Sequence, residues 1–196
     1  MRSAICVLMM MLGLAGALHA RDATKPSTRT VPQQPQETAI SPSAVEPAIT
    51  SQIYVGEPAP DFELDGSLGR PERLSRLKGY WILLVFSDTR SEVAPIKEIE
   101  PDLRKLGVKP YAVCADKAHV LKAFAEKMEL SCVLLSDVTG EISQLYGLYD
   151  LLHSRIRPGF VLINRQGVVD MALLGQMIPM EDILGLVHTA VTGGSM

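Results

Sequence analysis

Cysteine is scarce in this chain. Only three cysteines occur among its 196 residues, and none lies between residues 7 and 113. That gap excludes a thiolate nucleophile, or a metal site built on thiolates, from the whole stretch. The two later cysteines, Cys114 and Cys132, do not make a disulfide scaffold, and a chain of this length can form its core without one.

An excess of positive charge is also absent. Lysine and arginine together number 19, against 22 aspartates and glutamates, which gives a formal net charge of −3. A surface that neutralises nucleic-acid phosphates needs the opposite balance. We therefore predict no nucleic-acid partner.

No apolar run is long enough to span a bilayer comfortably. The run from Ala4 to Leu14 follows Arg2 and precedes small residues, which predicts a signal peptide over residues 1–20. Export to the periplasm or to the outside of the cell follows, with cleavage after Ala17 or Ala20 left open. An uncleaved segment is the only membrane contact that we expect.

Large apolar residues are few from residue 21 to residue 52, where five prolines and nine serines or threonines occur. Such a composition buries too little surface to offset the entropy lost on ordering the chain. We predict a disordered linker over residues 21–52, followed by one domain over residues 53–192.

The most informative apolar segment of that domain is Trp-Ile-Leu-Leu-Val-Phe at 81–86, which predicts a fully buried central strand. Helical spacing of Ile96, Ile99, Leu103 and Leu106 predicts a helix that Gly107 ends. The remaining patterns predict strands at 109–115, 132–137 and 160–163, the last with a hairpin return. They also predict helices at 141–146 and 180–191, and another that has Asp116 as its N-cap and is marked by Val120, Leu121, Phe124 and Met128.

Two motifs carry a resemblance to a known family. Residues 55–62 read Val-Gly-Glu-Pro-Ala-Pro-Asp-Phe, and residues 134–141 contain Leu-Leu-Ser-Asp followed by Gly-Glu. In these motifs the chain resembles the peroxiredoxin and redoxin (AhpC-TSA-like) branch of the thioredoxin-like superfamily, over about residues 53–192. The resemblance implies an α/β, thioredoxin-like fold with a mixed central sheet flanked by helices. It also implies membership of an antioxidant and thiol oxidoreductase class.

The family places its reactive thiol in the loop after the buried strand, as Pro-x-x-x-Thr-x-x-Cys or Cys-x-x-Cys. One alignment of this chain puts Pro95 at that position, and another puts Ser91 and Ala94 there. Neither alignment places a cysteine at the position of the reactive thiol, so the sequence leaves open whether the protein is an enzyme. Copper-binding relatives also need these thiolates, and we predict no metal ion and no other cofactor.

Cys114 is the one candidate for a relocated redox thiol. It ends a predicted strand just before a helix, where a lowered pKa would favour thiolate, although a small buried hydrophobe is the simpler interpretation. If the two strands are parallel neighbours, Cys114 pairs near Ser136, which leaves Cys132 roughly 13 Å away along the strand. We therefore predict no disulfide between the two cysteines.

The candidate binding residues are Thr89, Arg90 and Ser91 in the Ser87–Pro95 loop, together with Arg157 and Pro158. Pro158 matches the proline that faces the redox loop in thioredoxin-like proteins and is usually cis there. It either helps to hold an extended peptide or partner protein, or only shapes the turn.

Alternatives remain open for the other polar residues. Arg155 and Arg157 either contact a ligand or form a solvated pair, and hydrolysis by Ser91 would need His153 as its base. Two functions follow: a divergent exported member of the oxidoreductase family without its standard cysteine chemistry, or a non-catalytic binding module.

Overall fold

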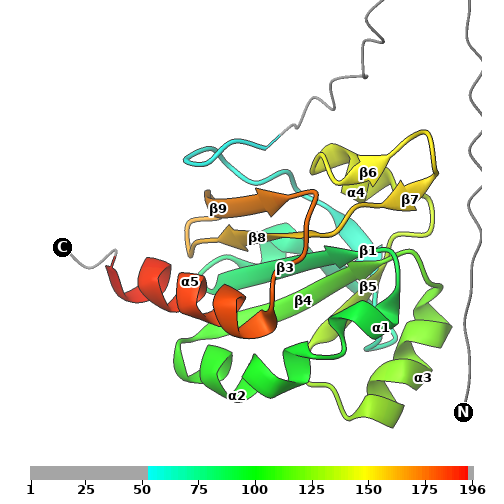
Figure 1. Ribbon diagram of the computed structural model, residues 1–196, viewed down its shortest axis with the longest axis horizontal. Coiled ribbons are helices and arrows are strands. Elements are labelled where there is room, and N and C mark those ends of the chain that lie inside the picture. Colours follow the sequence, from blue (N-terminus) through cyan, green and yellow to red (C-terminus); the bar gives the residue numbers. More distant parts are fainter. Residues whose placement is uncertain (1–52, 194–196) are drawn as a thin grey trace, which may run out of the picture. The chain divides into compact units, whose positions relative to one another are not determined.

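The computed structural model describes residues 53–193. The expected signal peptide (1–20) and linker (21–52) lie outside the described residues. The domain is built on a five-stranded mixed sheet in the order β5-β4-β3-β8-β9 (Figure 1). Its strands are β3 (Trp81–Ser87), β4 (Val108–Cys114), β5 (Val133–Ser136), β8 (Gly159–Ile163) and β9 (Val169–Leu174).

Strand β3 lies at the centre of the sheet. It runs parallel to β4 and antiparallel to β8. Its residues from Ile82 to Ser87 are all buried, because helices or loops cover both faces of the sheet. This is the strand that the continuous apolar run predicts, and the prediction is confirmed.

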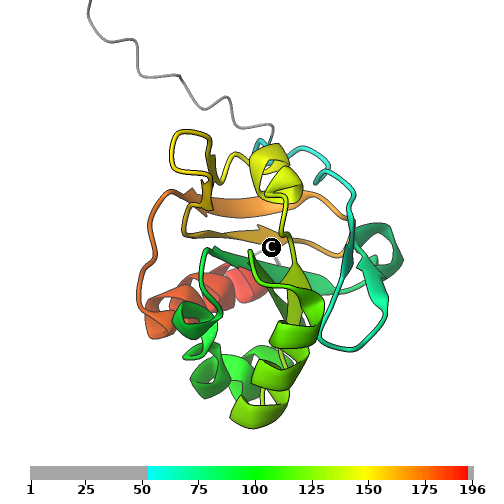
Figure 2. The ribbon, with the colours of Figure 1, turned by 90° about the vertical axis from the view of Figure 1, so that its right-hand side faces the viewer.

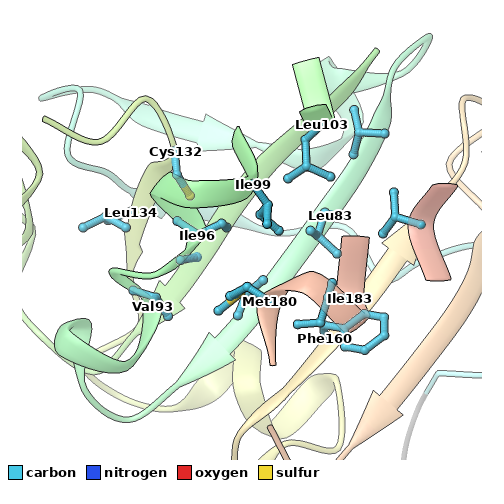
Figure 3. Packing of buried hydrophobic residues seen from close by; sticks show 14 of the residues in the cluster. Leu83, Val93, Ile96, Ile99, Leu103, Cys132, Leu134, Phe160, Met180 and Ile183 are labelled. Atoms are coloured by element: carbon cyan, nitrogen blue, oxygen red, sulfur yellow. The ribbon is translucent and has the colours of Figure 1, made fainter. Parts of the chain in front are cut away.

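The two faces of the sheet carry separate apolar clusters. Leu83 and Val85 point to one face, which is covered by α2 (Ile96–Lys105), α3 (Ala118–Met128) and α5 (Met180–Gly193). Figures 1 and 2 show these three helices on one side of the sheet, and Figure 3 shows side chains of β3, α2 and α5 meeting between them.

The opposite face is covered by shorter pieces. Ile82, Leu84 and Phe86 pack there against the 3-10 helix η1 (Leu74–Leu77) and the segment that contains α4 (Glu141–Leu145). The Tyr146 ring lies 5.4 Å from the Phe86 ring, and its hydroxyl donates to the Pro60 carbonyl at 2.7 Å. This contact ties the leading segment of the domain to the sheet.

Two small hairpins have no counterpart among the sequence predictions. They are β1 (Glu63–Asp65) with β2 (Pro71–Arg73), and β6 (Tyr149–Asp150) with β7 (Arg155–Ile156). Strands of two or three residues are too short to produce a periodic pattern. The loop after β1 covers the edge of β5, since Ser67 donates its backbone N–H to the Leu134 carbonyl at 2.8 Å and accepts the Leu134 N–H at 3.1 Å.

The Asp116 cap is a wrong prediction. Helix α3 begins after Lys117, which makes no side-chain cap hydrogen bond. The Asp116 carboxylate instead accepts a hydrogen bond from Arg90.

Strands β4 and β5 are parallel and pair Cys114 with Ser136, as the register argument predicts. Both thiols are free. Among residues 53–193, no helix combines the length and apolar character needed to cross a bilayer.

The two glycines at 159 and 185 provide a matched pair of tests for this packing. A Cβ on Gly159 would lie 2.5 Å from the Leu173 carbonyl oxygen and 2.9 Å from Leu148, whereas a Cβ on Gly185 in α5 would meet nothing within 4 Å. We expect Gly159→Ala to lower the free energy of unfolding by about 1–3 kcal/mol through overpacking. Gly185→Ala should raise it by about 0.5–1 kcal/mol through helix propensity. Urea denaturation measures both, and a neutral Gly159→Ala would contradict the close packing at the start of β8.

Candidate functional site

The loop after β3 lies at the edge where the parallel strands end. Ser87, Cys114 and Ser136 occupy neighbouring register positions across β3, β4 and β5. Asp88 and Thr89 then lead into the short helix α1 (Arg90–Val93). Figure 2 looks onto this edge from the side of the β6–β7 hairpin. In open α/β sheets this edge is the usual place for a site.

Ser87 is fully buried and donates its hydroxyl hydrogen to the Glu92 carboxylate. Glu92 belongs to the first turn of α1, so this bond folds the helix back onto the end of β3. The Glu92 carboxylate is thereby held at the end of β3, where Ser87 pairs in register with Cys114.

Arg90 does not point freely into solvent. Its guanidinium donates to the Asp116 carboxylate at 2.6 Å and lies 5.7 Å from the centre of the Phe124 ring. The Asp116 carbonyl in turn accepts the Ser136 hydroxyl at 2.8 Å. Arg90, predicted from the sequence as a binding residue, therefore forms an ion pair within the domain.

Asp88 joins the loop to the segment before β8. Its carboxylate accepts the backbone N–H of Ile156 at 3.0 Å. The family resemblance implies that Pro158 faces this loop, and the hydrogen bond joins the loop to Ile156, two residues before Pro158. Sequence reasoning missed Asp88, although an aspartate directly after a buried strand was the available signal.

Thr89 and Ser91 are exposed on this edge, and the Ser91 hydroxyl lies 3.3 Å from that of Thr89. His153, the base that hydrolysis would need, sits instead at the tip of the β6–β7 hairpin. There its Nδ1 lies 2.8 Å from the Asp150 carboxylate. The structure shows no hydrogen bond between Ser91 and His153.

Arg157 lies beside Pro158 and differs from Arg90 in having no ion pair among the described residues. Its guanidinium passes close to Gly175, where a Cβ would approach it to 2.9 Å. Its backbone N–H donates to the Leu148 carbonyl at 2.7 Å. Arg157 is half-buried. It is therefore the positioned cation at this edge that has no carboxylate partner within residues 53–193.

The environment of Cys114 opposes ionisation. The thiol is 0% exposed, and burial, reinforced by the Asp116 and Glu92 carboxylates, raises the pKa of Cys114 to about 12, although Arg90 acts in the other direction. The lowered pKa considered from the sequence is thus wrong. Burial likewise raises the pKa of Cys132 well above its ordinary value.

The sequence and the fold were compared with those of known proteins. The AhpC/TSA family model matches residues 55–172. The chain belongs to the AhpC/TSA family. It is 30% identical over 137 residues to the thiol-disulfide oxidoreductase ResA of Geobacillus thermodenitrificans, covering 67% of this chain and 75% of that protein.

A second relative is a selenocysteine-containing peroxiredoxin of Peptoclostridium acidaminophilum. It is 32% identical over 134 residues, which cover 60% of this chain and 66% of the selenoprotein. Among solved structures, the peroxidoxin BcpB of Mycobacterium tuberculosis superposes with a TM-score of 0.64 at 18% identity, over 72% of this chain and 97% of that one. The predicted thioredoxin-like fold is confirmed.

Within this AhpC/TSA scaffold, the first turn of α1 holds Ser91, and Pro95 lies beyond α1 as the N-cap of α2. Ser91 is the second residue of α1, after Arg90, and neither position carries a thiol. Residues 53–193 contain no group of three or more His, Cys, Asp or Glu side chains placed to hold a metal ion.

The raised thiol pKa values predict an alkaline loss of stability. The unfolded chain ionises its thiols near pH 9, whereas folded Cys114 stays protonated up to about pH 12. The protonated thiol therefore contributes its full stabilisation of the folded state below pH 9. Between pH 9 and pH 12 the free energy of unfolding falls by up to about 1.4 kcal/mol per pH unit for each thiol. Urea denaturation between about pH 8 and 10 should show a shallower decline for Cys114→Ala than for the unmodified protein. Parallel curves would contradict this account.

Proposed function

We propose that the protein is an exported, divergent AhpC/TSA domain that does not carry out the family's cysteine chemistry. One observation carries the proposal: the segment from Asp88 to Pro95 after β3 contains no thiol, and Cys114, at the end of the neighbouring strand β4, is fully buried. Export is supported by the signal-like segment at residues 1–20 alone.

The chemistry of these groups supports the same conclusion. Peroxide reduction needs a thiolate that passes through sulfenic acid, and a serine hydroxyl does not undergo that cycle. With the pKa of Cys114 at about 12, only about one molecule in 10⁵ carries the thiolate at pH 7. A buried thiol also has no path for peroxide unless the loop opens.

A peroxide-consumption assay with a thiol reductant tests this proposal. The protein lacking residues 1–20 and its Cys114→Ala variant should both consume hydrogen peroxide at the rate of the protein-free control, beside an active cysteine peroxiredoxin. Turnover that disappears in Cys114→Ala would mean that the family chemistry has moved to that thiol. Turnover that survives the substitution would equally overturn the proposal.

A second function is favoured by the Asp88–Ile156 hydrogen bond. This bond holds the exposed Thr89 and Ser91 hydroxyls beside the segment that carries Arg157, whose charge has no partner within residues 53–193. We propose that this edge binds an extended peptide or partner protein with an acidic group for Arg157. Hydrogen bonds from a cation to a carboxylate are among the stronger ones available to such a site.

An array of short random peptides measures this binding. We expect peptides rich in aspartate or glutamate to bind, with at least about a tenfold loss of affinity in Arg157→Gln. Arg155→Gln is the matched control, since Arg155 lies two residues away, is exposed and only approaches Asp150 at 3.9 Å. Equal losses in the two variants would indicate nonspecific charge attraction, and an absence of bound peptides would exclude the binding function.

A further inference from the structure

A cavity of about 360 Å³ lies at the end of the sheet opposite the candidate site. Figure 1 shows the start of β3 and the end of β8 at this end, away from the β6–β7 hairpin. The register separates the two ends clearly: Ile82 pairs with Ile163 beside the cavity, and Phe86 pairs with Gly159 beside the candidate site. Four residues along a strand correspond to roughly 13 Å.

The cavity has an apolar floor and polar walls. The floor is made by side chains of the core cluster on this face, namely Leu74, Leu77, Ile82 and Ile163. The walls come from the leading segment around Ala59 and from the turn between β8 and β9, which are joined by the hydrogen bond from the Ala59 N–H to the Gly167 carbonyl at 2.9 Å. Sites for small molecules commonly combine such a floor with a few polar groups.

Two acceptor side chains in the walls, Asp61 and Asn164, already have hydrogen-bond donors. The Asp61 carboxylate accepts the Ser75 backbone N–H at 2.9 Å and the Arg73 guanidinium at 3.0 Å. These hydrogen bonds and the Arg73 charge outweigh burial and lower the pKa of Asp61. The Asn164 side-chain oxygen accepts two backbone N–H groups of its own turn, at 3.0 and 3.1 Å.

Donor groups, in contrast, remain free. Lys78 lines the cavity and makes no hydrogen bond or ion pair within residues 53–193, and its stem lies against Gly167, with Cε 3.6 Å from the place of a Cβ. Tyr80 lines the cavity too, and its ring lies against the Lys109 ammonium at 3.3 Å, although Lys109 is not itself a lining residue. The Lys78 ammonium is therefore the unpaired charge that the walls offer above an apolar floor.

We propose that this cavity binds a small amphiphilic anion, with a compact apolar or aromatic body on the floor and a carboxylate or sulfonate at Lys78. The volume suits one small molecule. A cationic head group would meet Lys78 with repulsion, and an uncharged apolar molecule would leave the ammonium without a partner. The site is independent of the β3–α1 loop, so peroxide chemistry and peptide binding there neither support nor weaken it.

The probe for the test is 8-anilinonaphthalene-1-sulfonate, an aromatic sulfonate, beside its uncharged counterpart N-phenyl-1-naphthylamine. We expect the full chain to bind one sulfonate, and Lys78→Gln to raise its dissociation constant at least about tenfold while the uncharged probe changes less than about threefold. Lys122→Gln is the matched control, because Lys122 is exposed on α3 and does not line the cavity. It should leave both affinities unchanged.

The location of binding is tested separately. Ser75→Trp places an indole at the cavity mouth and should abolish binding of both probes, and the amide resonances of Lys78 and Gly167 should shift on titration while those of Thr89 and Ser91 stay unchanged. Binding that survives either Lys78→Gln or Ser75→Trp overturns the proposal. So does an absence of binding to the unmodified chain, or a set of shifts confined to the exposed Leu151–Leu152 hairpin tip.

Discussion

The burial of β3 on both faces is the constraint on which the rest of the structure depends. Its side chains from Ile82 to Phe86 alternate between the two apolar clusters. Successive residues therefore pack against the helices on one face of the sheet and the shorter segments on the other. A one-residue shift would send every side chain to the wrong cluster. The fixed register in turn decides which residue ends the strand, and hence where the loop with Asp88 begins.

The polar residues after β3 are arranged to satisfy one another. Asp88 holds the segment before β8, Arg90 pairs with Asp116, and Glu92 accepts the Ser87 hydroxyl. An active thiol needs uncompensated positive charge and free N–H groups around it. Here burial and the Asp116, Glu92 and Asp88 carboxylates oppose a thiolate at Cys114, and Arg90, which acts in the other direction, is paired with Asp116.

The two ends of the sheet thus offer different chemistry on one scaffold. At the carboxyl ends of the parallel strands, the loop with the exposed Thr89 and Ser91 hydroxyls is joined to the segment of Arg157, which has no ion pair within residues 53–193. At the other end, an apolar floor lies beneath donors and the Lys78 ammonium. Membership of the AhpC/TSA family supplies the scaffold, while the activity depends on the groups that each end presents.

The sequence by itself determined the family, the fold class and the main strands and helices. The apolar run at 81–86 and the helical spacing after it are local patterns, and local patterns suffice to locate long elements. It also predicted the Cys114–Ser136 register, because two parallel strands of known ends leave few alternatives.

Only the tertiary structure decided which polar groups meet. The Arg90–Asp116 pair joins residues 26 apart in the chain, and the Asp88–Ile156 hydrogen bond joins residues 68 apart. Neither contact has a periodic signal, so the sequence predicts Asp116 as a helix cap and Arg90 as a binding residue, without indicating that the two side chains meet. The same holds for the pKa of Cys114, because desolvation and neighbouring charge depend on packing from several elements at once.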